Sequence, residues 1–169
     1  MLSKRMEEAI NDQIKWEFFS GYLYLSMAAF FEDLGLSGFA RWMEAQTQEE
    51  LFHGMKMYHY VNEHGGRVTL QAVDQPPSTW DSPLAAFENA LEHEQLVTSR
   101  INALMDLAFD ERDHATTAFM QWFVSEQVEE EASVGEVVDK LKLTADGGAL
   151  YLLDKELGAR VFTPPQNGG

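Results

Sequence analysis

The apolar residues of this chain recur with helical spacing through four long segments, and this pattern constrains the fold more than any other feature. Chain breakers cluster at Gly35, from Gly65 to Pro83, from Asp110 to Asp113 and from Asp146 to Gly148. The segments between them are about 27–31 residues long, and apolar side chains recur every three or four residues within each. Four helices with one apolar face each can bury those faces by packing together. The sequence therefore predicts an all-α four-helix bundle.

The lengths of the connections predict the topology of this bundle. Short breaks make the first and second helices antiparallel neighbours, and the third and fourth likewise. The link from about Gly66 to Ser82 is longer: ~17 extended residues reach ~55 Å, whereas a helix of ~27 residues is only ~40 Å long. We expect this link to cross the length of the bundle, so that helices two and three run parallel. Asp81 or Ser82 before Pro83 is a suitable start for the third helix.

A shorter helical segment and a tail complete the expected organisation. The segment from about Ala149 to Val161 predicts a short fifth helix at the C-terminus. Residues 1–162 are expected to form one domain, because their length suits a single core. Residues 163–169, which are rich in proline and glycine, are expected to be a flexible tail.

Near its middle, each apolar face is interrupted by carboxylate, imidazole or amide side chains. These interruptions are Glu17, Glu50, His53, Glu94, Gln127 and Glu130. Mid-helix positions of a bundle lie at one height, so we expect these side chains in a single core layer. A buried carboxylate without a partner costs several kcal/mol, and no lysine or arginine lies on these faces near that height. Two divalent cations would neutralise the layer, and oxygen ligands with one imidazole suit iron or manganese.

A second acidic set adjoins the central one. Glu49 adjoins Glu50, Glu129 adjoins Glu130, and Glu126 lies one turn before Glu130, so the set is Glu49, Glu126, Glu129 and Glu130. This set predicts an outer cation site that shares Glu130 with the central layer. Tyr24 lies two turns from Glu17 on the same face, and its buried hydroxyl would need a partner such as a carboxylate ligand. His59, His64, His93 and His114 lack acidic partners in phase with the layer and are expected on the surface or in loops.

Each of these residues has an ordinary interpretation when it is taken alone. A single glutamate on a helix is usually solvated, and His53 by itself would more often be a core histidine than a ligand. Trp122 is expected to contribute to core packing. The coincidence of polar side chains at one height on four helices is what distinguishes a metal site from these interpretations.

The charge of the chain excludes several classes of partner. Asp and Glu total 28 against 12 Lys and Arg, a formal net charge of -16, which disfavours nucleic acid and favours cations.

No apolar run approaches the ~18 residues of a membrane span, so no membrane partner is expected. There is no cysteine, which excludes a disulfide framework or a thiolate metal site. Without an apolar signal-peptide core after Lys4 and Arg5, a cytoplasmic location is expected.

From Met6 to about Arg160 the chain resembles the non-haem bacterial-type ferritins, a family of ferritin-like di-iron proteins. The matching positions are Glu17, Tyr24, Gln48 to His53, Glu94, Glu126 to Glu130 and Leu152 to Gly158. The resemblance implies a ferroxidase that stores iron. Ferrous iron is oxidised by dioxygen or hydrogen peroxide at a di-iron centre within each subunit. The ferric product mineralises inside a hollow homo-oligomeric cage of 24 subunits, whose four-fold channels the fifth helix lines.

The resemblance also implies a role for each matching residue. The first iron position would be held by Glu17, Glu50 and His53. The second would be held by Glu50, Glu94 and Glu130, with Glu50 bridging, Gln127 close by and the Tyr24 phenol beside a ligand. A third iron site would be formed by Glu49, Glu126, Glu129 and Glu130. No haem is expected, because Leu51 stands where a haem-binding relative has methionine.

Two functions of other classes remain as alternatives. The first is a non-catalytic shell protein whose acids only collect cations. The second is a di-iron oxygenase acting on an organic substrate, which would need a substrate pocket. Di-iron enzymes and bacterioferritins usually carry a second Glu-x-x-His pair, whereas this chain has Gln127 and Glu130 at those positions. Aerobic addition of ferrous iron would separate these functions.

Overall fold

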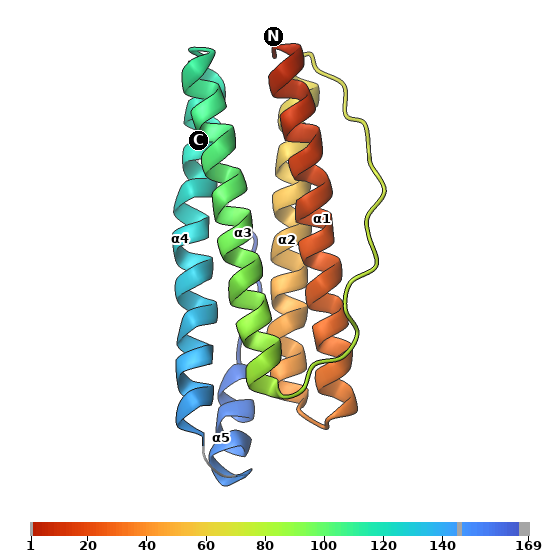
Figure 1. Ribbon diagram of the computed structural model, residues 1–169, viewed down its shortest axis with the longest axis vertical. Coiled ribbons are helices and arrows are strands. Elements are labelled where there is room, and N and C mark those ends of the chain that lie inside the picture. Colours follow the sequence, from red (N-terminus) through yellow and green to blue (C-terminus); the bar gives the residue numbers. More distant parts are fainter. Residues whose placement is uncertain (1, 145–146, 166–169) are drawn as a thin grey trace.

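Four long helices pack side by side as a bundle, and a short fifth helix lies at one end (Figure 1). The long helices are α1 (Lys4–Asp33), α2 (Ser37–Glu63), α3 (Pro83–Asp110) and α4 (His114–Leu143), and the short one is α5 (Gly147–Leu157). This computed structural model describes residues 2–144 and 147–165. The all-α bundle predicted from the apolar spacing is confirmed.

Side-chain caps explain where three of the long helices begin. Ser3, Ser82 and Asp113 accept hydrogen bonds from the backbone N–H groups of Met6, Ala85 and Thr116, which would otherwise have no partner. Ser82 precedes Pro83 at the first turn of α3, as expected from the sequence.

Helix α2 has no side-chain cap of its own and receives one from α5 instead. The Asp154 Oδ1 atom accepts hydrogen bonds from the backbone N–H of Gly38 at 2.8 Å and of Phe39 at 3.0 Å. The approach is so close that a Cβ atom on Gly38 would collide with the Asp154 carbonyl group. Glycine at position 38 therefore allows α5 to dock on the start of α2.

The link between α2 and α3, residues 64–82, runs along the outside of α1 from one end of the bundle to the other (Figure 1). Asn11 on α1 holds it by two hydrogen bonds, donating to the Arg67 carbonyl at 2.9 Å and accepting from the Thr69 N–H at 2.9 Å. Further along, the Ser26 hydroxyl donates to the Pro77 carbonyl at 2.6 Å. The link spans the bundle and makes α2 and α3 parallel, as its length predicts.

Two apolar clusters fill the bundle on either side of its middle. One is built from residues such as Met27, Phe31, Phe39, Phe87 and Val137. The other is built from residues such as Ile10, Ile14, Met57, Ile101 and Met120. The polar residues near the middle of each long helix are therefore enclosed by one apolar cluster on each side along the bundle axis.

The C-terminal part differs from the sequence-based expectation in one respect. α5 ends at Leu157 rather than near Val161, and the chain then passes close to α2. A Cβ on Gly158 would lie 3.1 Å from the Gly38 Cα, and Phe162 packs on Phe52 with ring centroids 6.1 Å apart. Of the expected flexible tail, residues 163–165 are described without helix and residues 166–169 lie outside the described residues. In the described part of the chain, no helix is long and apolar enough to cross a membrane.

Candidate metal centre

All four long helices contribute side chains to a buried polar layer at the middle of the bundle. α1 supplies Glu17, α2 supplies Glu50 and His53, α3 supplies Glu94, and α4 supplies Gln127 and Glu130. Each of these side chains is at most 4% exposed. Local helix geometry explains the pair on α2, because residues three apart lie on the same face.

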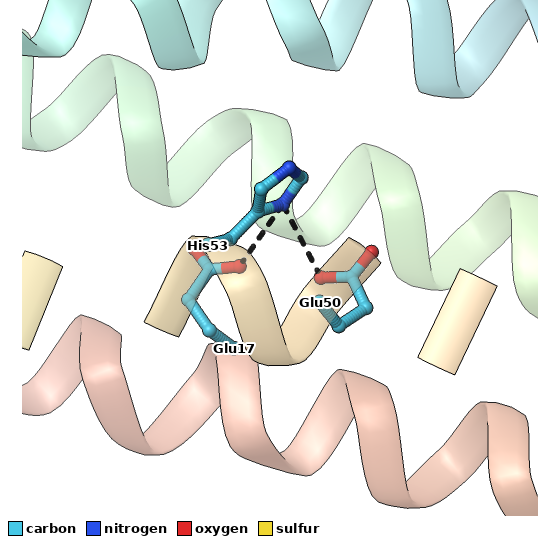
Figure 2. Close-up of side chains that lie close together, drawn as sticks. All are labelled: Glu17, Glu50 and His53. Carbon is cyan, nitrogen blue, oxygen red and sulfur yellow. Dashed lines mark ion pairs between the residues drawn. The ribbon is translucent and has the colours of Figure 1, made fainter. Parts of the chain in front are cut away.

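The ligand atoms of this layer fall into two groups that share one residue. One atom from each of Glu17, Glu50 and His53 lies within 4.8 Å of the others, and the same holds for Glu50, Glu94 and Glu130. Figure 2 shows His53 Nδ1 facing Glu17 Oε2 at 3.8 Å and Glu50 Oε2 at 3.7 Å. The arrangement suits two neighbouring cations with the Glu50 carboxylate between them.

Amides and a phenol hold the other oxygens of these carboxylates. The Gln13 amide donates to Glu17 Oε1 at 2.8 Å, and the Gln46 amide donates to Glu50 Oε1 at 3.0 Å and to Glu130 Oε1 at 3.2 Å. On Glu94, Oε1 accepts from the Tyr24 hydroxyl and Oε2 accepts from the Gln127 amide at 3.2 Å.

Two buried carboxylate oxygens, Glu17 Oε2 and Glu130 Oε2, have no hydrogen-bond partner. An ionised carboxylate oxygen in this state is costly, because it has lost water and gained no donor. Within the described residues, no lysine or arginine pairs with any of the four central carboxylates. Cations bound between the carboxylates would satisfy both oxygens, and the oxygen-rich donor set with one imidazole fits iron.

Burial raises the pKa of every carboxyl group in the layer. The pKa of Glu17 rises to about 8 through burial and the nearby Glu50 charge, and that of Glu94 rises to about 8 for the same two reasons. Burial raises the pKa of Glu50 to about 7, and it raises the pKa of Glu130 well above the ordinary value. The layer in its cation-free form therefore holds protons at neutral pH that bound cations would displace.

The outer acidic set is less enclosed than the central layer. Glu129 is exposed, Glu126 is half-buried, and Glu49 Oε2 accepts a hydrogen bond from Arg160 at 2.7 Å. In the part of the chain that the structure describes, no three of these carboxylates approach within 4.8 Å of one another. Arg160 comes from the segment after α5 and lies over the Trp42 ring at 4.1 Å.

His93 corrects one expectation from the sequence. A surface or loop position was expected for His93. In the structure its side chain packs against α1 with 6% exposure, and its Nε2 lies 2.7 Å from the Ser20 hydroxyl. Burial lowers its pKa to about 4. The buried face of a bundle helix is wide. The contact between α1 and α3 therefore encloses His93 as well as its neighbour Glu94. Trp122 packs edge-on against His53, with ring centroids 5.4 Å apart.

Gln13 and Gln46 contact carboxylates of the layer but were not singled out by the sequence-based reasoning. Both lie on the helical faces that carry the predicted ligands, and each precedes a ligand by four residues. The spacing Gln-x-x-x-Glu occurs at Gln13–Glu17 and again at Gln46–Glu50. This repeated amide one turn before a buried glutamate is the signal that could have identified them.

A bundle that gathers carboxylates from all four helices and one histidine at its centre defines the class of ferritin-like di-metal proteins. Residues 7–144 match the ferritin-like domain family. The bacterial non-haem ferritin of Bacteroides fragilis is 44% identical over 160 residues, covering 95% of this chain and 100% of that protein. That of Staphylococcus aureus is 42% identical over 163 residues, covering 96% and 98%.

Solved structures agree with this relationship. An engineered closed form of the Archaeoglobus fulgidus ferritin matches with a TM-score of 0.95 and 57% identity, covering 96% of this chain and 100% of that one. The open pore ferritin of the same archaeon matches with a TM-score of 0.94 and 56% identity, covering 95% and 99%. The chain belongs to the bacterial non-haem ferritin family.

Proposed function

We propose that this protein stores iron and oxidises ferrous iron at the paired clusters in the middle of the bundle. Glu17, Glu50 and His53 hold the first iron, and Glu50, Glu94 and Glu130 hold the second. Tyr24 and Gln127 orient Glu94 between them. Membership of the non-haem ferritins supports this assignment, and so does the buried donor set.

The observation that carries this proposal is the sharing of Glu50 by two buried ligand groups. A single cation site would not need a second carboxylate group at the same depth. Two adjacent ferrous ions can supply two electrons together, which one ferrous ion cannot. The pairing therefore favours redox chemistry over simple collection of cations.

The reaction balances with iron as the substrate. Two ferrous ions each lose one electron to dioxygen, which takes up two protons and leaves as hydrogen peroxide. When hydrogen peroxide is the oxidant, it takes two electrons and two protons and leaves as two water molecules. Carboxylate ligands favour the ferric product, because hard oxygen donors bind the higher charge more strongly.

The raised pKa values of the carboxyl groups couple iron binding to the release of protons. With pKa values of about 8, Glu17 and Glu94 are largely protonated at neutral pH before iron binds, and Glu50, with a pKa of about 7, is about half protonated. Iron binding releases those protons. Hydrogen bonds from Gln13 and Gln46 keep the carboxylates oriented as the protons leave.

We further propose a third iron site at Glu49, Glu126, Glu129 and Glu130, as the resemblance implies. The contact between Arg160 and Glu49 means that iron at this site must compete with a guanidinium group. The weaker enclosure of Glu126 and Glu129 suits a site that holds iron briefly before mineralisation.

The expected assembly is a hollow homo-oligomeric cage of 24 subunits, which would confine the ferric mineral. Residues 1–162 would act as its single structural domain. The cytoplasm is the expected compartment, in keeping with the bacterial non-haem ferritin family.

Aerobic addition of ferrous iron to the iron-free protein tests the proposal. We expect rapid oxidation of two iron ions per chain, followed by slower growth of an amber mineral in a large particle. Glu50→Ala should slow the rapid phase at least tenfold while leaving the particle assembled, because it removes the shared ligand. Glu92→Ala, on the exposed face of α3, is the matched control. Unchanged kinetics in Glu50→Ala would contradict the assignment, and uptake without accelerated oxidation would favour a cation-collecting shell.

A further inference from the structure

A chain of hydrogen bonds connects the surface of the bundle with the first iron position. Arg100 on α3 donates from Nε to Gln13 Oε1 at 2.9 Å, and Gln13 in turn donates from Nε2 to Glu17 Oε1 at 2.8 Å. Gln13 and Glu17 are each 1% exposed, whereas the Arg100 side chain is 24% exposed. The chain therefore runs from a partly solvated cation through a buried amide to a buried carboxylate.

The guanidinium group determines which way the Gln13 amide faces. Arginine has only donor groups, so the amide atom that faces Arg100 must be the oxygen. The amide nitrogen then faces Glu17 and donates to it. With the amide reversed, its oxygen would face a carboxylate oxygen, and its NH₂ group would face a cation.

Arg100 is itself held in one orientation. Arg100 Nη2 contacts Asp12 Oδ2 at 2.5 Å, and the guanidinium group lies 4.6 Å from the centre of the Trp16 ring. Asp12, Gln13 and Trp16 are neighbours on α1, so one short stretch of helix receives the whole side chain. A planar, pre-oriented group of this kind loses little freedom when it bonds to the amide.

The consequence for Glu17 is that its two oxygens become different. Oε1 is occupied by Gln13, whereas Oε2 is buried without a hydrogen-bond partner and lies 3.8 Å from His53 Nδ1. Oε2 is therefore the oxygen left free for a metal ion. At the second group the corresponding amide, Gln46, donates directly to Glu50 and Glu130.

We propose that Arg100 is a positioning residue for the first iron position, acting through Gln13 to present Glu17 Oε2 to the metal. This inference rests on the proposed role of Glu17 as an iron ligand. Residues that orient a metal ligand from behind typically contribute 10–100-fold to metal affinity. Among the described residues no arginine bonds to Gln46, so the effect of Arg100 should fall on one of the two iron positions only.

Anaerobic calorimetric titration of the assembled, iron-free protein with ferrous iron tests this inference. We expect Arg100→Met, which keeps an apolar stem against Trp16, to weaken one of the two positions about tenfold. The other position should stay within threefold of the unchanged protein. Arg5→Met is the matched control, because Arg5 is exposed and lines the same groove between α1 and α3.

A double substitution shows whether Arg100 acts through Gln13. In a Gln13→Leu background, Arg100→Met should change the ferrous affinity no further, since the link is already broken. Gln13→Leu by itself gives a second route should Arg100→Met fail to assemble. It removes the amide that donates to Glu17 and adds no new carboxylate beside the site, so it should weaken the same position at least tenfold.

The possible outcomes separate this inference from the proposed function. Unchanged affinity at both positions, or equal weakening of both, would overturn the role of Arg100. Further weakening by Arg100→Met in the Gln13→Leu background would overturn the route through Gln13. Glu17→Ala decides the underlying assignment: if it abolishes one position while Arg100→Met has no effect, only the positioning role fails. If Glu17→Ala leaves both positions intact, the ligand assignment itself fails.

Discussion

Burial is the dominant influence on the individual residues at the centre of this bundle. It raises the pKa of four carboxyl groups and lowers that of His93, because the charged form of each group loses water without gaining an equivalent partner. The same residues that make the metal-free core costly therefore make it receptive to cations. The extensive apolar clusters on either side stabilise the fold and offset the free energy lost by burying these groups.

These pKa values predict that the metal-free protein loses stability as the pH rises from about 6.5 to 8. Glu17 and Glu94 have folded pKa values of about 8 and Glu50 of about 7, all above the ordinary 4.5. Their stabilising contribution is complete below pH ~4.5 and is lost as the pH rises through the folded values. His93, lowered to about 4, contributes fully above its ordinary 6.5, so it does not vary in this window.

Urea denaturation of the chelator-treated protein at several pH values measures this effect. The urea concentration at the denaturation midpoint should decrease as the pH is raised from 6.5 to 8. The decrease should be smaller in Glu94→Gln, whose side chain cannot ionise. Saturating Zn²⁺ should largely abolish the dependence, because the bound ion keeps the carboxylates ionised. A midpoint that rises with pH in the metal-free protein would contradict the prediction.

The helices and links of this protein are joined by a few side chains that bond to the backbone of another element. Asp154 of α5 takes over the capping of α2, and Asn11 of α1 takes over the anchoring of the long link. Neither Asp154 nor Asn11 bonds to a carboxylate of the metal layer in these contacts. Each can therefore be tested without removing a hydrogen bond to the proposed iron ligands.

Asp154→Ala should lower stability by about 1 kcal/mol, the usual value of a helix cap, and should loosen α5. The reason is that the Gly38 and Phe39 N–H groups lose their acceptor. Thermal unfolding gives the stability, and hydrogen exchange of residues 147–157 reports the docking of α5. Asp139→Ala on the exposed face of α4 is the control. Equal exchange in Asp154→Ala and the unchanged protein would rule out this capping role.

Asn11→Ala should destabilise the protein by about 1–3 kcal/mol, because a buried side chain that makes two hydrogen bonds is lost. The side chain is 7% exposed and bonds the link at Arg67 and Thr69. Limited proteolysis should cut within residues 64–82 sooner than in the unchanged protein. Asp12→Ala would disturb Arg100, so Glu8→Ala, exposed on the same helix, is the better control. Unaltered cleavage would show that other contacts hold the link.

At the scale of the whole molecule, the net charge of -16 acts on cations before they reach any site. Such a charge attracts cations over a distance set by the ionic strength, with a Debye length of ~30 Å at 0.01 M salt and ~8 Å at 0.15 M. We therefore expect the acidic surface to act in the capture of ferrous iron and the buried layer to act in its oxidation.

The initial rate of iron oxidation at limiting ferrous iron should accordingly fall severalfold between 0.01 and 0.15 M salt. Stopped-flow absorbance in aerobic buffer provides the measurement. At saturating iron the rate should change little, because capture no longer limits it. A rate independent of salt at limiting iron would show that surface charge does not steer the substrate.

Much of the fold and of the site could be predicted from local spacing. The recurrence of apolar residues predicts the four helices, the length of residues 66–82 predicts the crossing link, and the polar interruptions predict which side chains share a layer. These features depend on helical geometry within one segment and on simple lengths. They do not require knowledge of how the helices rotate against one another.

The sequence by itself thus determined the helices, their order and the acidic centre, because helical periodicity is a property of neighbouring residues. Tertiary structure decided which oxygen of Glu17 is bonded and which is free, that His93 is buried, and that Arg160 pairs with Glu49. Each of these depends on the distance between atoms far apart along the chain. Such distances are set only when the helices pack, since a rotation of one helix by a fraction of a turn would exchange those partners.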